Sequence, residues 1–461
     1  MFDSPKLSRR EALQLSTAGV VGFSMSGWLE ALAAQTANNT QRRRSCILLW
    51  MNGGPSQMDT FDLKPGHANG GPYQSIQTSV PGIRISEHLP RVARNMDKMA
   101  LIRAMSTREG DHGRGTFYLR SGYLPQGPIQ YPTLGSLVSK EIGAPDLPLP
   151  NFVSVAPYRL FSPAAYSSGF LGPQYAPLMV GEINNFNFNQ QQQDPYDQSL
   201  QVADMRHPQL QQRNDPQEQA AVNERQFNAR VDLLQDMESD FVARHQTVAA
   251  RSHQTAYDRA IRLMRTSART AFNLAEEPER LRDAYGRNLF GQGCLLARRL
   301  VERGVAFVEV TLGAMAGNPI GWDTHGQNFQ NVQRLSEILD PAWGTLMDDL
   351  RQRGLFETTT IVWMGEFGRT PRINQGQGRD HYPNAWTTVL AGGGVRGGSV
   401  FGRTSADGTT VEDPRAVSVP DFIATVCGAL GVDHANQNMS NVGRPIPLTE
   451  RTARPITEVL A

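Results

Sequence analysis

Mainly apolar runs of six to eight residues recur along the chain, and most of them end at a glycine or a polar residue. A continuous apolar run of this length is typical of a strand that is buried on both faces, as in a parallel sheet covered by helices. We therefore predict buried strands over four segments, namely residues 46–51, 305–312, 359–364 and 386–393.

Helical periodicity fills the stretches between these runs. Over residues 329–350, apolar side chains recur at intervals of three and four and form one face of a helix, and Gly354 follows where a helix-ending left-handed residue belongs. Residues 421–432 show a similar pattern near the C-terminus. Helices that alternate with buried strands predict an α/β fold, a three-layer sandwich with a mostly parallel central sheet.

The first 33 residues differ from the rest of the chain. Arg9 and Arg10 precede a mildly apolar stretch, near whose end the segment Ala31-Leu32-Ala33 supplies small residues at two of three positions. Paired arginines before such a stretch are typical of a twin-arginine export signal, with a periplasmic or extracellular destination. The stretch is too polar for a comfortable membrane span, so none is expected once the signal is removed. Retention as an uncleaved anchor and an ordinary amphipathic first helix are the alternatives.

The composition changes again between residues 182 and 228, where glutamine and asparagine dominate. Such a segment is typical of a surface excursion. It leads into a helical pattern, so we predict a single α/β domain over residues 34–461 that carries a Gln/Asn-rich and helical insertion at residues 182–272.

Charge and cysteine content narrow the function. The 45 basic and 44 acidic residues nearly cancel, which argues against capture of nucleic acid. Cys46, Cys294 and Cys427 are widely spaced in apolar surroundings, so we expect buried thiols and no disulfide framework.

Polar side chains gather where the predicted strands end. Asn52 follows the first strand directly, Asp323 and His325 follow the second, and Glu366 lies two residues after the third. His381 comes shortly before the fourth strand. Because ligands of an open α/β sheet bind outside the carboxyl ends of the strands, these groups are expected to converge. Carboxylates and imidazoles together suit a divalent transition metal, with zinc or manganese foremost.

Each of these residues also has a structural interpretation. Asp323 could cap the helix that begins near residue 327, and His325 could bind a backbone carbonyl. Glu366 could pair with Arg369 or Arg372.

A further cluster occurs in the segment DHGRGTFYLRSGY, which begins at Asp111. A helix that starts here would direct free N–H groups and Arg114 toward an anion. Thr116 or His112 could then be a nucleophile, or His112 a metal ligand. The alternative is an exposed helix start with Thr116 as its cap.

Several motifs in order resemble the domain of unknown function 1501 family. They are LLWMNGGPSQMDTFDLKP, DHGRGTFYLRSGY, AYGRNLFGQGCLLARRLVERGVAFVEV, WDTHGQNF, GEFGRTPRIN, GRDHYPNAW and LAGGGVRGG. That family is grouped with the alkaline phosphatase and sulfatase superfamily, so the resemblance implies an alkaline-phosphatase-like α/β sandwich with metals at the strand ends.

The superfamily pattern assigns roles to individual positions. Glu366 falls on a metal-binding aspartate and Phe367 on a metal-binding histidine, a role that phenylalanine cannot fill. Asn52 stands where an aspartate bridges metal and nucleophile, and Asp59 is a substitute from the same loop. His112 falls near the nucleophile.

Asp323 and His381 match the remaining metal-ligand positions best. His325 follows Asp323 by two residues, which is closer than the superfamily pattern, and these departures favour one metal over two.

These observations lead to the hypothesis of an exported metal-dependent hydrolase that acts on an anionic small-molecule or polysaccharide ester of phosphate or sulfate. The ion would be zinc, with manganese or calcium as alternatives, and it would activate water. The metal candidates are Asp323, His325, His381, Glu366, Asn52 and Asp59, and the catalytic candidates are His112, Arg114 and Thr116. The rival hypothesis is a catalytically degenerate extracytoplasmic binding protein of the same fold.

Overall fold

The computed structural model describes most of the chain outside its N-terminus and one long internal segment. The described residues are 43–181, 229, 232, 233, 236, 267–313, 318 and 320–461. The predicted signal at residues 1–33 lies outside them, as does the predicted insertion at 182–272 except for the four isolated residues and 267–272.

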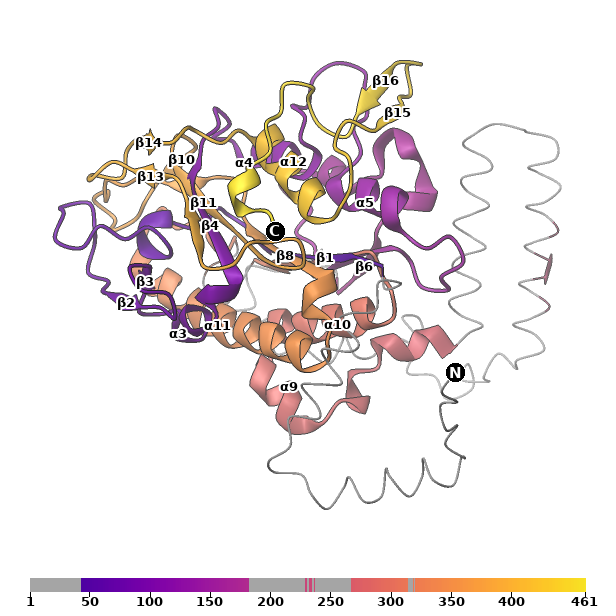
Figure 1. Cartoon of the computed structure of the whole chain (residues 1–461), viewed down its shortest axis with the longest axis horizontal. Coiled ribbons are helices and arrows are strands. Elements are labelled where there is room, and N and C mark those ends of the chain that lie inside the picture. The colour runs from indigo at the N-terminus through magenta and orange to yellow at the C-terminus, as the bar shows by residue number, and fades with distance from the viewer. Residues whose placement is uncertain are drawn as a thin grey trace, which may run out of the picture.

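A large, mostly parallel sheet forms the centre of the fold (Figure 1). Its eight strands are β1 (Ser45–Met51), β4 (Met99–Met105), β5 (Phe152–Val155), β6 (Leu178–Val180), β7 (Phe307–Leu312), β8 (Thr359–Met364), β11 (Trp386–Gly392) and β12 (Ser399–Phe401). Their order is β12-β4-β11-β8-β1-β7-β5-β6. β1 pairs in parallel with β7 and with β8, whereas β11 runs antiparallel to both of its neighbours. The predicted α/β fold with a mostly parallel sheet is confirmed.

Helices cover both faces of the sheet. Their bounds are α3 (Pro90–Arg94), α4 (His112–Ser121), α5 (Leu134–Ile142), α9 (Glu279–Tyr285), α10 (Leu289–Glu302), α11 (Asn328–Gln352) and α12 (Val419–Ala429). Figure 1 shows α9, α10 and α11 on one face and α4, α5 and α12 on the other. The described helices therefore complete a three-layer sandwich.

The alternation of side chains along β1 explains why this strand is apolar throughout. Ile47 and Leu49 pack into the core that contains the side chains of α10 and α11, and Leu48 and Trp50 pack into the core that contains those of α12. Successive residues of a strand point to opposite faces, so a strand covered on both sides needs apolar residues at every position.

Small two-stranded pairs complete the described secondary structure. They are β2 (Ser75–Gln77) with β3 (Arg84–Ser86), β9 (Gly368–Arg369) with β10 (His381–Tyr382), β13 (Arg403–Thr404) with β14 (Val411–Asp413), and β15 (Gln437–Met439) with β16 (Pro445–Pro447). The β9–β10 pair brings the two ends of the 368–382 loop together at the edge where β8 ends.

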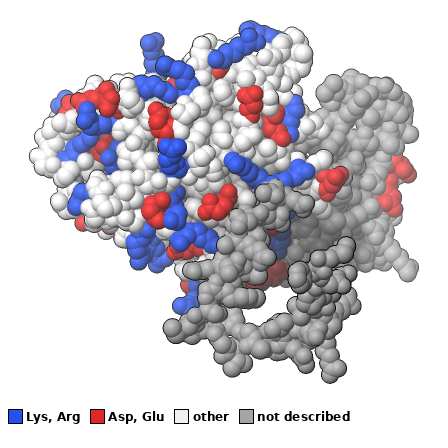
Figure 2. All heavy atoms as spheres, in the orientation of Figure 1, with Lys and Arg blue, Asp and Glu red and all other residues white. Residues whose placement is uncertain are grey.

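The structure bears on the predictions about the cysteines, the surface charge and the membrane. Cys46, Cys294 and Cys427 are buried and unpaired, as expected. On the face shown in Figure 2, acidic and basic side chains are interspersed without an extended field of one sign. Within the described part of the chain, every helix is either too short or too polar to cross a bilayer.

Candidate metal centre

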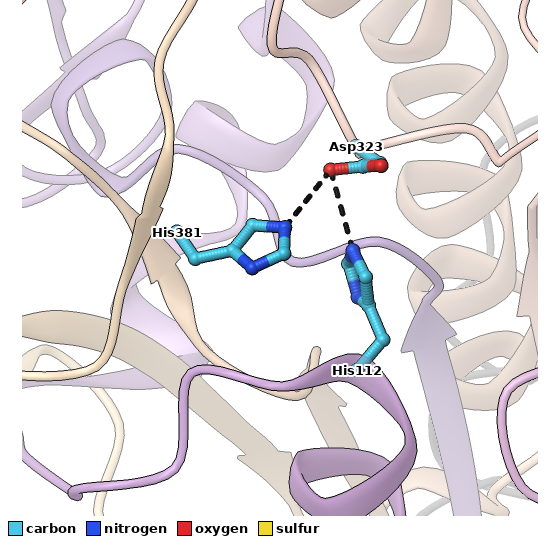
Figure 3. Close-up of side chains that lie close together, drawn as sticks. All are labelled: His112, Asp323 and His381. Carbon is cyan, nitrogen blue, oxygen red and sulfur yellow. Dashed lines mark hydrogen bonds and ion pairs between the residues drawn. The ribbon is translucent and has the colours of Figure 1, made fainter.

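Three loops at the carboxyl edge of the sheet bring together His112, Asp323 and His381 (Figure 3). His112 is the first residue of α4, Asp323 lies in the loop after β7, and His381 begins β10. Each offers one ligand atom, and these atoms all lie within 4.8 Å of one another. These three side chains are therefore close enough together to hold a metal ion.

The three histidines near Asp323 share one orientation. His112 Nδ1 lies 2.7 Å from Glu366 Oε1, His325 Nδ1 lies 2.7 Å from Asp380 Oδ1, and His381 Nδ1 lies 2.7 Å from the carbonyl oxygen of Gly110. Carboxylates and carbonyls accept hydrogen bonds, so each Nδ1 carries the proton that it donates. The Nε2 atom of each neutral ring is then left with a free lone pair.

All three Nε2 atoms face the same carboxylate oxygen. Asp323 Oδ1 lies 3.3 Å from His112 Nε2, 3.1 Å from His325 Nε2 and 3.3 Å from His381 Nε2. Ligands bound tetrahedrally to zinc at about 2.05 Å are about 3.3 Å apart, so these separations match the edges of a metal coordination sphere.

Without a cation or an extra proton, this arrangement is repulsive. His112 Nε2 is buried and makes no well-directed hydrogen bond, although Asp323 Oδ1 is close. Lone pairs that point at a carboxylate oxygen need a positive charge between them, and histidines held through Nδ1 by a carboxylate or carbonyl are typical of metal ligands. The residues present therefore fit a divalent ion.

Arg369 supplies part of the positive charge around Asp323. It is fully buried, and its Nη2 donates a 2.6 Å hydrogen bond to Asp323 Oδ1. Burial alone would raise the pKa of Asp323, but His112, His381 and the Arg369 charge outweigh burial and hold that pKa well below its usual range. Asp323 is consequently held in its ionised form, the form in which a carboxylate can bind a metal.

The environment of His112 favours its charged form in the metal-free state. Burial lowers its pKa, but the carboxylates of Asp323 and Glu366 outweigh that effect and raise the pKa to about 9. The ring is also stacked on Phe161, with centroids 4.2 Å apart and an interplanar angle of 6°. His112 is thus fixed in orientation and must lose a proton when it binds a metal.

Glu366 fixes the orientation of the His112 ring through a hydrogen bond to its Nδ1. Its fully buried carboxylate accepts hydrogen bonds through Oε1 from His112 Nδ1 and, at 2.9 Å, from the N–H of Gly53. The structural alternative, a salt bridge to Arg369 or Arg372, is wrong, because the ionic partner of Glu366 is His112 and Arg369 pairs with Asp323. The glycine before Glu366 is required, since a Cβ on Gly365 would lie 2.7 Å from the carbonyl oxygen of Met51.

Asn52 and Asp59 are buried, and their side chains bond to residues outside the cluster. The Asn52 side chain donates to Ile320 O and accepts from Trp50 Nε1, both at 3.4 Å. The backbone carbonyl of Asn52 accepts a hydrogen bond from the N–H of Trp322. Asp59 forms a two-point salt bridge with Arg379, at 2.7 and 3.1 Å. Both residues shape the loops around the cluster.

The residue that caps the start of α4 is not Thr116. Asp111 is the cap, and its side chain accepts from the N–H of Arg114. Thr116 lies inside the helix, so the alternative in which Thr116 is the cap is wrong. Its hydroxyl is buried without a hydrogen-bond partner. The exposed Arg114 side chain binds both carboxylate oxygens of Glu109 at 2.8 Å.

Asp323 does not cap the following helix either. α11 begins after Gln327, which adopts a left-handed conformation with φ of 50° and makes no capping hydrogen bond. The carboxylate of Asp323 therefore faces the histidines of the cluster and does not face the helix start.

Sequence reasoning missed three partners of the cluster. Arg369 was considered only as a partner of Glu366, and Asp380 and the carbonyl of Gly110 were not considered. The adjacent pair Asp380-His381 was a usable signal, because carboxylates commonly accompany metal-binding histidines. A backbone carbonyl leaves no mark in a sequence.

Comparison with known proteins identifies a family and several distant structures. Residues 43–460 match the family described as protein of unknown function (DUF1501). No curated protein sequence matches the chain.

The similar solved structures share little sequence with the chain. The lipoteichoic acid synthase LtaP from Listeria monocytogenes is 8% identical, with 91% of this chain and 80% of that chain covered and a TM-score of 0.41. The PsFucS1 sulfatase from Pseudoalteromonas sp. is 12% identical over 88% and 72% of the two chains, with a TM-score of 0.37. A third structure, Ps i-CgsB, is 11% identical over 85% and 72%, with a TM-score of 0.38.

Proposed function

Because the chain belongs to the family described as protein of unknown function (DUF1501), and because its imidazoles converge on one carboxylate, we propose that it is an exported metal-dependent hydrolase of phosphate or sulfate esters. The observation that carries this proposal is the shared orientation of His112, His325 and His381, each held through Nδ1 with Nε2 toward Asp323.

The residues divide into ligands and supports. His112, Asp323 and His381 would hold the ion, while Glu366 and the carbonyl of Gly110 fix the two imidazoles. When bound, a divalent ion supplies Lewis acidity toward an ester oxygen and lowers the pKa of water. Two nitrogen donors favour zinc over manganese and calcium, which prefer oxygen ligands.

Substrate class and export rest on the sequence. The motifs that resemble the alkaline phosphatase and sulfatase superfamily favour an anionic ester, either a small molecule or a polysaccharide. The paired Arg9 and Arg10 favour the twin-arginine route to the periplasm or beyond, with cleavage after Ala33.

The second candidate function is a binding protein without turnover. Arg369 already neutralises Asp323 at 2.6 Å, and the buried Phe367 occupies a position where the resemblance places a metal-binding histidine. A protein that retained the cluster and lost the chemistry would keep such contacts.

The test combines metal analysis with chromogenic esters. The purified chain is expected to contain about one divalent ion and to hydrolyse p-nitrophenyl phosphate or p-nitrophenyl sulfate. Asp323→Ala and His381→Ala should remove both properties, and His67→Ala, a change at an exposed histidine elsewhere, should remove neither. An ion without turnover supports the binding protein, and the absence of any ion from the wild-type chain contradicts the metal site.

A further inference from the structure

The cluster contains two overlapping sets of donors. The inner set is His112, Asp323 and His381. An outer set consists of Asp323 Oδ1, His381 Nε2 and His325 Nε2, with separations of 3.1 Å, 3.3 Å and 3.0 Å. Both sets share Asp323 and His381 and differ only in the third ligand.

The two sets leave different room for a ligand from solution. A catalytic tetrahedral site has three protein ligands and keeps its fourth position for water or substrate. With the inner set as the three protein ligands, His325 would compete with a solute for the fourth position.

Solvent exposure distinguishes the two sets. The side chains of His112 and Asp323 are each 13% exposed, whereas His325 is 48% exposed. Asp380, which holds His325 Nδ1, is 54% exposed. The outer side of the cluster is therefore the side from which a solute arrives.

The backbone of His325 is fixed, whereas its side chain is half-exposed and donates its Nδ1 proton to an exposed carboxylate. The carbonyl of His325 accepts a 2.9 Å hydrogen bond from Asn374 Nδ2, and the N–H of Arg379 bonds Thr324 O at 2.9 Å. Asp380 accepts from Nδ1 on the exposed side of the ring, and Nε2 faces Asp323 Oδ1 and His381 Nε2 on the inner side. The inner contacts bring lone pairs together unless a cation or a proton is shared, so this half-exposed ring can rotate away without disturbing the loop.

We propose that His325 is an exchangeable ligand, which occupies the solvent side of the ion and is displaced by the phosphate or sulfate group of the incoming molecule. This inference rests on the proposed function, because it takes the metal site as given. Asp380 is the positioning residue that holds the ring with Nε2 toward the site. No bond other than the ligand contact forms or breaks in this exchange.

The experiment uses cobalt as a visible substitute ion and inorganic phosphate and sulfate as separate probes. Wild type and His325→Ala should each take up about one Co²⁺ per chain, and His381→Ala should take up none. If His325 occupies the site in about nine of ten molecules, its removal tightens the apparent phosphate or sulfate affinity about tenfold. The change is followed through the visible absorption of the cobalt.

Controls separate this inference from the proposed function. Asp380→Asn, which keeps the imidazole but weakens its orientation, should shift anion affinity in the same direction by a smaller factor, and His67→Ala should leave it unchanged. Loss of Co²⁺ from His325→Ala as complete as from His381→Ala would overturn the exchangeable role alone. Unchanged anion affinity in a cobalt-loaded His325→Ala would do the same, whereas a wild type that binds no Co²⁺ overturns the metal site itself.

Discussion

The Nε2 atoms of His325 and His381 lie 3.0 Å apart, and neither neutral ring has a proton to place between them. The Nδ1 proton of His325 is donated to Asp380, and that of His381 to the carbonyl of Gly110. Two lone pairs at this distance repel each other, so a cation or an additional proton must be shared. This relationship makes the predictions below specific.

Replacing Glu366 with glutamine should weaken metal binding without removing a ligand. The amide can present an N–H group to His112 Nδ1, which disfavours the tautomer that leaves Nε2 free. Loss of such a supporting carboxylate typically costs about 10- to 100-fold in metal affinity. Competition with a chromogenic chelator measures the effect, and Glu279→Gln, at a side chain that is 88% exposed, is the matched control. Equal affinities of the two variants would refute the supporting role.

Metal affinity should rise with pH up to about 9. The folded-state pKa of His112 is raised from 6.5 to about 9, so its imidazolium stabilises the metal-free protein below pH 6.5, and that contribution is lost as the pH rises through 9. Metal must expel this proton, so the apparent affinity should increase by up to about tenfold per pH unit between these values. Calorimetry in buffers of different ionisation enthalpy should detect about one released proton at pH 7.5. A pH-independent affinity would count against His112 as a ligand.

Gly378→Ala should damage the site through the backbone. A Cβ at this position would lie 1.8 Å from the carbonyl oxygen of His325, so the loop that carries His325 must shift. We expect a loss of about 1–3 kcal/mol in the free energy of unfolding, measured by urea denaturation, together with weaker metal uptake. Gly326→Ala, where the nearest atom to the new Cβ is 3.8 Å away, should have little effect. Similar behaviour of the two variants would contradict the steric argument.

The buried ion pair between Arg120 and Glu309 should be costly to break from one side. Arg120 lies between the rings of Trp50 and Tyr166, at 4.2 and 4.1 Å, and its guanidinium contacts the carboxylate of Glu309 on β7. Arg120→Met leaves that carboxylate without its partner, so we expect a loss of about 3–5 kcal/mol in unfolding free energy.

The double variant Arg120→Met with Glu309→Leu should recover part of this loss, because it no longer buries an unpaired charge. Urea denaturation of the four proteins in this cycle measures the coupling. A double variant that is less stable than Arg120→Met would show that the pair does more than balance charge.

The elements that could be predicted are those whose signal lies within one segment of the sequence, such as an uninterrupted apolar run. The run over 359–364 has no polar interruption except threonine, and it forms β8 with the predicted bounds. β4 was not predicted, because the partly buried Arg103 interrupts its apolar run. β5 has four residues, too few for a periodic signal.

The sequence predicted which residues gather at the candidate site better than it predicted what each of them does there. Strand ends brought Asp323, His325 and His381 into one hypothesis, and the structure places them together with His112. Which nitrogen each ring presents depends on partners far away in the chain, such as the carbonyl of Gly110. No pattern of residue types encodes such contacts.

The loops around residues 323–328 and 369–381 share backbone hydrogen bonds, among them those from Arg379 to Thr324 and from Gln327 to Gly376. Substitutions in one loop will therefore change the effect of substitutions in the other, and their free energies will not add. Attempts to re-engineer this centre for another ion or ester should vary both loops in one combinatorial library, because a scan of single positions would undervalue the combinations that work.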